Sequence, residues 1–291
     1  MNIEHEVPFG ERTTFRVGGT ASSWVELDDP SSLRSLAENG DLRAPIYVLG
    51  RGSNTLVADS GFSGTVVHLG PGFAGIEVDD RSFQLRVGGA ADLPVIARRS
   101  VEAGLQGFEW AVGVPGSLGG AIRMNAGGHG SDMAATTLEV SVVDLTTGVM
   151  RTRTHDELMF SYRSSTIAPT DLVVEARLQL SPGDPAEGRE RLKEIVRWRR
   201  EHQPGGANCG SVFTNPLGDS AGRLIDAAGL KGYRIGTAEV SEKHANFIQA
   251  DSGGRGDDVA AVISSVADQV EARSGIRLMS EVKMVGFDGA T

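Results

Sequence analysis

The sequence predicts an α+β protein with several compact regions, and three observations lead to this fold class. Short apolar runs typical of strands recur along the 291 residues, with amphipathic stretches typical of helices between them. The 39 glycines fall in short clusters between these runs and form no period, which excludes collagen-like and low-complexity chains. With 40% hydrophobic residues, a chain of this length can bury a large core and form two or three domains.

Residues 1–69 are predicted to form a small β-α-β unit. The segment 13–19 indicates a turn and 23–29 a strand, and a short helix follows, capped around Ser31 and stopped by Gly40. The apolar runs IYVL and GTVVHL are typical of buried strands, and a loop containing Gly-Arg-Gly-Ser-Asn lies between them.

Residues 70–183 form the second predicted region. The alternating GIEV, the DDRS turn and FQLRV predict a hairpin, and a helix is expected from about Ala91 to Glu102. A long glycine-rich passage, 104–130, comes next. The segments LEVSVVDLTTGVMRTRT and DLVVEARLQL then return to strands joined by turns.

The segment SPGD indicates a break, and a charged helix within 184–204 follows and ends at Pro204. Its narrow apolar stripe favours a linker over a core helix. Residues 205–275 are predicted to hold two helices, AGRLIDAAGL and DDVAAVISSVADQVEARSG, around one strand near 238–250. The final stretch, 276–291, begins as a strand that must pack on a part of the chain formed earlier.

Composition narrows the classes of function. A net charge of −10 without a broad basic face argues against a nucleic-acid-binding protein. The N-terminus lacks the pattern of a signal peptide, and no apolar run approaches the roughly 20 residues that span a bilayer. We therefore expect a cytoplasmic protein without membrane insertion. The six histidines lack metal-ligand spacing, so no metal is expected, and a single cysteine excludes an internal disulfide.

The loop Gly50–Asn54 has two interpretations. Its backbone N–H groups, with the side chains of Ser53 and Asn54, could converge on phosphate oxygens. The spacing differs from the dinucleotide fingerprint, and the following LVAD is too short and strand-like for a phosphate-binding helix. From these residues alone, a tight turn and a phosphate site both stay open.

The passage 104–130 indicates an ordered surface. So many glycines cost chain entropy, which a backbone lying flat against a large planar ligand would justify. The competing interpretation is a long disordered loop. The interleaved apolar residues argue for order: Phe108, Trp110, Val114, Leu118 and Ile122.

Four further residues have open roles from local sequence. Arg163, in a strand-like setting, suits a surface salt bridge or a ligand contact. Ser211 lies on a glycine turn without the G-x-S-x-G pattern, so a hydrolase nucleophile is not expected. Cys209 is interpreted as a buried thiol rather than a reactive one. Glu281, in an apolar strand, is either a structural ion-pair partner or a catalytic acid.

Seven segments, in this order, resemble one family closely: the UDP-N-acetylenolpyruvoylglucosamine reductases, or MurB enzymes. The matching stretches are TTFRVGG, LGRGSNTLVAD, GLQGFEWAVGVPGSLGGAIRMNAGG, SYRSS, NCGSVFTNP, AGRLIDAAGLKGYRIGTAEVSEKHANFIQ and SEVKMVG. They cover nearly the whole chain. The third region lacks a longer insertion, as in the shorter branch of the family.

The resemblance implies an FAD-binding fold of the vanillyl-alcohol oxidase/PCMH type. Residues 1–69 and 276–291 would form one flavin-binding subdomain and 70–183 the other. The helix of 184–204 would link them to a separate α+β substrate domain, 205–275.

The resemblance also implies a reaction with non-covalent FAD and with NADPH as hydride donor. Hydride addition to the enolpyruvyl group of a UDP-sugar builds charge on its carboxylate. Arg163 matches the family's arginine at that charge, Glu281 its carboxylate partner and Ser211 its proton donor. A monomer or weak oligomer is expected.

The remaining site residues fall into two sets. The implied cofactor-binding residues are Gly50, Arg51, Gly52, Ser53, Asn54, Thr55, Gly113, Pro115, Gly116, Ser117, Gly119, Gly120, Asn125, Ala126, Gly127 and Tyr162. The implied substrate-binding residues are Asn215, Lys231, Arg234, His244 and Asn246.

Three departures from the family pattern keep further functions open. Arg51 stands where a glycine is usual, Gly128-His129 replaces a small-plus-aromatic pair, and Cys209 replaces a small residue. These changes motivate a paralogue that reduces a related enolpyruvyl nucleotide. A flavin oxidase of the same fold and a non-catalytic flavin or UDP-sugar sensor also stay open.

Overall fold

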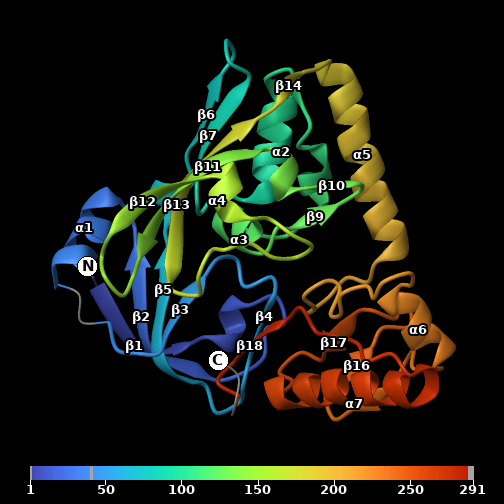
Figure 1. Ribbon diagram of the computed structural model, residues 1–291. Coiled ribbons are helices and arrows are strands. Elements are labelled where there is room, and N and C mark those ends of the chain that lie inside the picture. The colour runs from blue at the N-terminus through green and yellow to red at the C-terminus, as the bar shows by residue number, and fades with distance from the viewer. Residues whose placement is uncertain (1, 40–41, 288–291) are drawn as a thin grey trace. The chain divides into compact units, whose positions relative to one another are not determined.

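The computed structural model describes residues 2–39 and 42–287, and the chain divides into two compact units (Figure 1). Unit 1 comprises Met1–Glu4, Ser23–Arg51 and Gly64–Arg199, and unit 2 comprises His5–Ser22, Gly52–Ser63 and Arg200–Thr291. The four-part division predicted from the sequence stays a prediction.

One sheet has strands that cross the unit boundaries. Its order is β1 (Asn2–Pro8), β2 (Thr20–Leu27), β5 (Phe62–Leu69) and β3 (Ile46–Leu49). Strand β3 pairs parallel with β5, which fits the predicted β-α-β unit. The helix of that unit, α1 (Pro30–Asn39), is present. Its predicted cap is wrong: the Asp29 carboxylate, and not Ser31, accepts the backbone N–H groups at 31 and 32. The predicted stop at Gly40 lies outside the described residues.

A five-stranded antiparallel sheet forms the centre of unit 1. Its order is β12 (Met150–Thr154), β11 (Thr137–Asp144), β13 (Asp171–Gln179), β7 (Gln84–Gly88) and β6 (Ile76–Asp79). The predicted hairpin and later strands are therefore confirmed. The other elements of this unit are α2 (Leu93–Glu102), β8 (Leu105–Gln106), α3 (Leu118–Arg123), β9 (Gly127–Gly128), β10 (Ser131–Asp132), α4 (His155–Leu158), β14 (Ser181–Pro182) and α5 (Pro185–His202), whose end crosses into unit 2.

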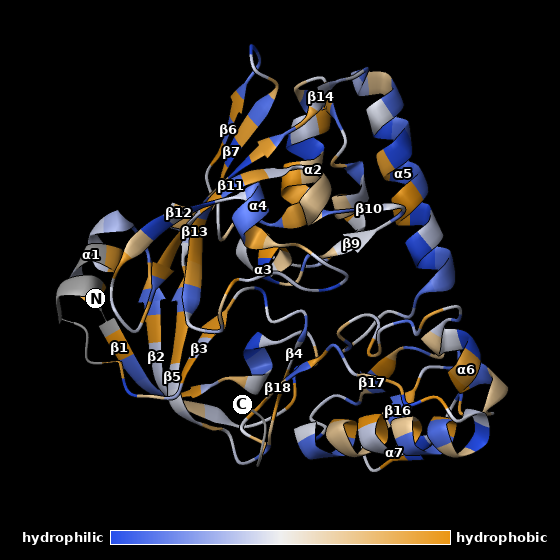
Figure 2. Ribbon diagram, viewed as in Figure 1, coloured by the Kyte–Doolittle hydropathy of each residue, from blue (hydrophilic) through white to orange (hydrophobic). Residues whose placement is uncertain are grey.

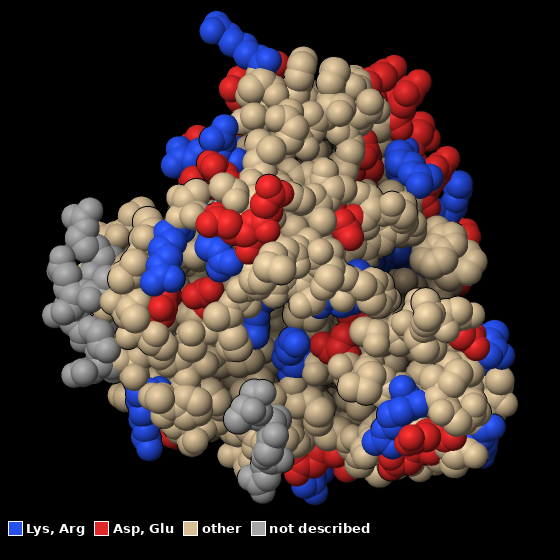
Figure 3. Space-filling model, in the orientation of Figure 1, with Lys and Arg blue, Asp and Glu red and all other residues tan. Residues whose placement is uncertain are grey.

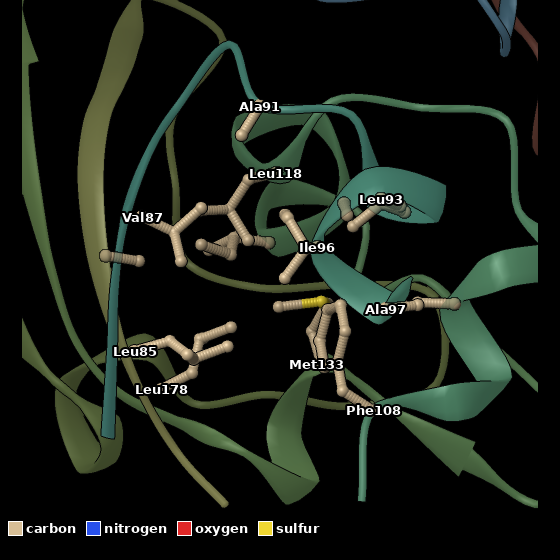
Figure 4. Close-up of a cluster of buried hydrophobic side chains, with 14 of the residues drawn as sticks. Leu85, Val87, Ala91, Leu93, Ile96, Ala97, Phe108, Leu118, Met133 and Leu178 are labelled. Carbon is tan, nitrogen blue, oxygen red and sulfur yellow. The ribbon is translucent and has the colours of Figure 1, made fainter. Parts of the chain in front are cut away.

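The larger core of unit 1 packs α2 and α3 on this sheet. Leu85 and Leu178 point from β7 and β13 toward Ile96 of α2, with Phe108 and Met133 beside them (Figure 4). All five side chains are inaccessible to solvent. Truncating one such leucine to alanine costs about 2–5 kcal/mol, so this core can hold a glycine-rich passage in a fixed shape.

Helix α5 is strongly hydrophilic along most of its length (Figure 2). Leu192 and Ile195 are its buried residues, and both belong to the core of unit 1. The helix is therefore present as predicted, but its narrow apolar stripe is used for packing within unit 1.

Unit 2 packs two helices on a small antiparallel sheet. The helices are α6 (Ala221–Ala227) and α7 (Gly256–Ser274), and the sheet order is β15 (Arg234–Ile235), β16 (Ala238–Val240) and β17 (Ile248–Ala250). One strand was predicted near 238–250, whereas the structure has two, with 241–247 as their connection. The terminal strand is also shorter than predicted: β18 (Lys283–Val285) pairs parallel with β4 (Thr55–Val57). Short 3₁₀ helices cover Gly10–Arg12, Pro71–Phe73, Glu109–Gly113 and Met133–Ala135.

Candidate active site

The glycine loop after β3 begins in unit 1 and passes into unit 2 after Arg51. In unit 1, a Cβ at Gly50 would overlap the Oγ of Ser117. Ser117 is buried at the N-terminus of α3, where its hydroxyl makes no capping hydrogen bond within the described chain. Gly50 and Ser117, 67 positions apart in the sequence, thus lie side by side.

The part of the loop in unit 2 is fixed by the segment 12–14. The Gly52 carbonyl accepts the N–H of Thr14 at 3.1 Å. Gly52 has a φ of +63°, and a Cβ there would strike the Arg12 carbonyl oxygen and the Cα of Thr13. Both the conformation and the space require glycine at this position.

Arg51, the first departure from the family pattern, is paired. Its Nε lies 3.1 Å from Oδ1 of Asp92, the residue that precedes α2, and the side chains are 59% and 39% exposed. The cation at this point of the loop is therefore neutralised by a neighbouring carboxylate.

The passage 104–130 is ordered, so the prediction from its interleaved apolar residues is confirmed. Phe108, Trp110, Leu118 and Ile122 are buried in the core of unit 1. The Gly119 N–H donates to Gly89 O at 2.9 Å, which holds the start of α3 against the sheet. Gly120, by contrast, is exposed. The backbone of α3 therefore has one side fixed to the protein and another open.

Arg163 lies in a tight turn, and the predicted strand-like setting is wrong. Ser161 and Ser164 exchange backbone hydrogen bonds of 3.0 and 3.1 Å, so Tyr162 and Arg163 are the two central turn residues. Arg163 has a φ of +56°. Its Nη2 donates to Gly127 O at 3.2 Å, and its guanidinium lies 5.2 Å from the centre of the exposed Tyr162 ring.

Unit 2 brings together Ser211, Glu281 and Asn54, which come from three distant parts of the sequence. The Glu281 N–H donates to Val212 O at 2.9 Å, next to the exposed Ser211. Asn54 Nδ2 donates to the Glu281 carbonyl at 2.8 Å. The Lys283 N–H donates to Asn54 O at 2.9 Å. Two of the three implied catalytic residues thus lie on adjacent segments beside the glycine loop, and Arg163 belongs to unit 1.

Cys209 is a buried thiol, as predicted. Burial raises its pKa, and the nearby charge of Glu281 raises it further. A thiol that stays protonated is a weak nucleophile, which agrees with the interpretation of Cys209 as an unreactive thiol.

Two of the implied substrate residues have structural contacts. The Asn246 amide donates to Phe213 O at 2.8 Å and accepts the N–H of the same residue at 2.9 Å. Asn215 Oδ1 accepts the Ala221 N–H at 3.0 Å, at the start of α6. Both side chains therefore shape the segment around Ser211.

The three basic residues among the implied substrate-binding residues, Lys231, Arg234 and His244, differ in their contacts. Arg234 is bound by two carboxylates, Glu239 at 2.6 Å and Asp251 at 2.7 Å. Lys231 lies 3.1 Å from Asp226. Burial and the charge of Lys231 lower the pKa of His244. Lys231 therefore contributes positive charge to the surroundings of His244.

Several acidic residues of the site were missed by sequence reasoning. Asp92 could have been found as the residue before a helix whose second position is proline. Asp59 Oδ1 accepts the Gly256 N–H at 2.7 Å, and its Oδ2 lies 2.8 Å from Arg255. Asp59 thereby holds the chain just after β4 to the start of α7, and no local sequence pattern indicates this link between distant segments.

Charge is mixed over the surface. On the face shown in Figure 3, Lys and Arg side chains are interspersed with Asp and Glu. Within the described ranges, 2–39 and 42–287, no three His, Cys, Asp or Glu side chains form a group that could hold a metal ion. No helix in the same ranges is long and apolar enough to cross a membrane.

The donor set fits a flavin dinucleotide. In unit 1 the Ser117 hydroxyl lies against Gly50, and in unit 2 Ser53 and Asn54 follow Gly52; such neutral donors beside glycines suit a pyrophosphate. The exposed Gly120 of α3 leaves backbone uncovered, which is compatible with contact to a planar group.

Comparison with known proteins defines the class. An FAD-binding domain model matches residues 31–153, and the C-terminal domain model of UDP-N-acetylenolpyruvoylglucosamine reductase matches residues 202–285. With the ordered glycine loops, these matches define a flavin-dependent oxidoreductase. FAD as cofactor, predicted from the sequence, is confirmed.

Full-length relatives define the family. The chain is 41% identical to UDP-N-acetylenolpyruvoylglucosamine reductase from Synechococcus sp. (strain WH7803), over 98% of this chain and 94% of the relative. It is 43% identical to the enzyme of the same name from Heliobacterium modesticaldum, over 97% and 90%. The chain therefore belongs to the UDP-N-acetylenolpyruvoylglucosamine reductase family, and the predicted resemblance is confirmed.

A solved structure supports the fold. The crystal structure of UDP-N-acetylenolpyruvylglucosamine reductase (MurB) from Thermus caldophilus matches with a TM-score of 0.85 and 33% identity, over 98% of this chain and 99% of that one. The predicted α+β FAD-binding fold of the vanillyl-alcohol oxidase type is confirmed by this match and by the FAD-binding model.

Proposed function

We propose that this protein reduces the enolpyruvyl group of UDP-N-acetylglucosamine enolpyruvate to give UDP-N-acetylmuramate, in peptidoglycan precursor synthesis. The observation that carries the proposal is the cluster of Ser211, Glu281 and Asn54. It occurs in a chain that is 41% identical, over 98% of its length, to a UDP-N-acetylenolpyruvoylglucosamine reductase. The chemistry that bound FAD supplies is hydride transfer, from NADPH to the vinyl carbon of the substrate.

Arg163 and Glu281 would act on the substrate carboxylate. Hydride addition to an α,β-unsaturated acid builds negative charge on that group, and a guanidinium can stabilise it with two parallel hydrogen bonds. Glu281 would add a further polar contact. Its backbone position is fixed on both sides, by Val212 and by Asn54.

Ser211 would hold the proton that completes the reduction. The hydride adds to the terminal vinyl carbon, and the serine hydroxyl then donates its proton to the adjacent carbon that bears the carboxylate. Water can return the proton, because Ser211 is exposed. A hydroxyl is a weak acid, but the enolate that it protonates is strongly basic.

The third region would bind the UDP-sugar. Lys231 is a better candidate for the diphosphate than Arg234, because the ion pairs of the described chain give Lys231 one carboxylate, Asp226, and Arg234 two. The positive charge of Lys231 also reaches His244, the other candidate. We further propose that the protein acts in the cytoplasm, as a monomer or weak oligomer.

An anaerobic experiment tests the function. NADPH should bleach the flavin of the purified enzyme, and UDP-N-acetylglucosamine enolpyruvate should restore its absorbance. Bleaching without restoration would favour a paralogue with another enolpyruvyl substrate. Flavin that stays with the protein after acid precipitation would indicate covalent attachment and a flavin oxidase.

A further inference from the structure

The turn that carries Arg163 is held by one neighbouring segment of unit 1, residues 123–127. Ser165 Oγ donates to Arg123 O at 2.9 Å, and Asn125 Nδ2 donates to Ser161 O at 2.9 Å. Arg163 itself donates to Gly127 O at 3.2 Å. These three bonds involve Ser161, Arg163 and Ser165, so they fix the turn and the residue after it against the segment between the end of α3 and the start of β9.

The backbone of both segments is strained. Among the described residues, seven that are not glycine have a left-handed φ. Two of these, Asn125 and Arg163, lie in these segments, and His129 and Met159 lie just outside them in the sequence. Such a conformation costs about 1–2 kcal/mol at each residue other than glycine. It persists only where surrounding contacts over-determine it, and such strain clusters at functional sites. The contacts that hold this turn are therefore part of how Arg163 is placed.

Asn125 joins the two segments through its side-chain amide. Its side chain is buried, and both protons of its amide are used, one by Ser161 O and one by Asp132 Oδ2 at 3.2 Å. Its Oδ1 accepts the Ala134 N–H at 3.0 Å. Because both of its amide protons are already donated, Asn125 has none left to donate to the FAD that the family resemblance predicted it to bind.

We propose that Asn125 is a positioning residue that acts through Arg163. By fixing Ser161, the first residue of the turn, its amide sets the direction of the Arg163 guanidinium toward the substrate carboxylate. The inference rests on the proposed function, because it needs Arg163 to stabilise the charge that develops there. A displacement of about 1 Å in a positioned group can cost on the order of 100-fold in rate.

The substitution Asn125→Asp tests this role. Aspartate tolerates a left-handed φ and can still accept the Ala134 N–H. It removes both donated protons and places a carboxylate against Ser161 O. In the FAD-loaded enzyme we expect NADPH to bleach the flavin at the wild-type rate, while reoxidation by the enolpyruvyl substrate slows about 10- to 100-fold. Binding of that substrate should weaken, and binding of UDP-N-acetylglucosamine, which lacks the carboxylate, should not change.

Two further variants separate the possible causes. Asp132→Asn keeps the Asn125–Ser161 bond and should reoxidise within about twofold of wild type; a defect equal to that of Asn125→Asp would overturn the inference. In the Arg163→Gln background, Asn125→Asp should add little, because residues that act as one unit are not additive. Additive losses would also overturn it. If Arg163→Gln alone left reoxidation unchanged, the proposed role of the arginine in the reaction would be wrong.

Discussion

Ser211 combines an exposed hydroxyl with a backbone held from the neighbouring segment at Val212. A proton donor needs both properties, because the donated proton must be replaced by solvent while the donor keeps its place. Ser211→Ala should therefore leave flavin bleaching by NADPH unchanged and slow reoxidation by the enolpyruvyl substrate about 10²- to 10⁴-fold. Stopped-flow absorbance of the flavin measures the two half-reactions separately.

Ser280 offers a matched control for this prediction. It lies on the segment paired with residues 212–214, and its Oγ donates to Val212 O at 3.3 Å. Ser280→Ala removes a hydroxyl of the same kind from the same backbone pairing, and both half-reactions should stay near the wild-type rates. Equal losses in the two variants would mean that Ser211 matters for packing and not for proton transfer.

A family pattern named the candidate site residues, but the sequence did not predict the contacts that hold them. The sequence pointed to Arg163, but it could not show the turn, because a left-handed φ at an arginine has no local signal. Asn125 and Asn246 were assigned to ligands as polar residues in motifs. In the structure both amides form hydrogen bonds with backbone groups, because a buried polar group needs a hydrogen-bond partner.

At the scale of elements, two neighbouring positions of the glycine loop differ in what they accept: position 52 requires glycine, whereas the side chain at position 51 extends to Asp92. Gly52 has a left-handed φ and no space for a Cβ, because the backbone of Arg12 and Thr13 lies against it. Gly52→Ala should therefore displace the loop and weaken FAD binding at least 10-fold. Titration of the apoprotein with FAD, followed by the quenching of flavin fluorescence, measures this affinity.

Arg51→Gly is the comparison within the same loop. The side chains of the Arg51–Asp92 pair are 59% and 39% exposed, and pairs at the surface contribute about 0–1 kcal/mol. The arginine's charge is also neutralised by its partner, so its loss should change FAD affinity less than about 5-fold. A larger loss than in Gly52→Ala would show that Arg51 binds the pyrophosphate directly.

Strands and helices with strong local patterns were predicted correctly, whereas pairings between strands far apart in the sequence were not. The hairpin β6–β7 has alternating residues and a turn, so both its existence and its pairing follow from sequence. The pairing of β18 with β4 joins residues 228 positions apart at Lys283 and Thr55, and nothing local encodes it. The strands β16 and β17 are only three residues each, too short to separate by periodicity.

At the scale of the whole molecule, unit 2 is assembled from three separate stretches of the chain. Its core joins Phe15 and Val17 from the first, Leu56 from the second and helices α6 and α7 from the third. The strand β18 completes it: Val285 is buried, and its carbonyl accepts the Ala58 N–H at 2.9 Å. The C-terminal segment should therefore contribute strongly to the stability of the unit that contains Ser211 and Glu281.

The single cysteine provides a probe for that stability. Cys209 belongs to the core of unit 2, and its raised pKa keeps the thiol protonated at pH 8, where an ordinary thiol is partly ionised. Native protein should thus react slowly with iodoacetamide, and labelling should follow the unfolding of unit 2. The tryptophans Trp24, Trp110 and Trp198 all lie in unit 1, so their fluorescence reports the other unit.

Val285→Asp tests the contribution of β18. A carboxylate buried without a partner costs about 3–5 kcal/mol, and a urea m-value of about 1–3 kcal/mol per molar converts this loss to a midpoint at least 1 M lower. A brief pulse of iodoacetamide at each urea concentration locates the midpoint. Met279→Asp is the control, because this side chain in the same terminal segment is 66% exposed and should tolerate a charge with a change below about 0.5 kcal/mol. If the two variants had equal midpoints, the terminal strand would not stabilise unit 2, and the tethering of Glu281 would depend on its hydrogen bonds to Val212 and Asn54 alone.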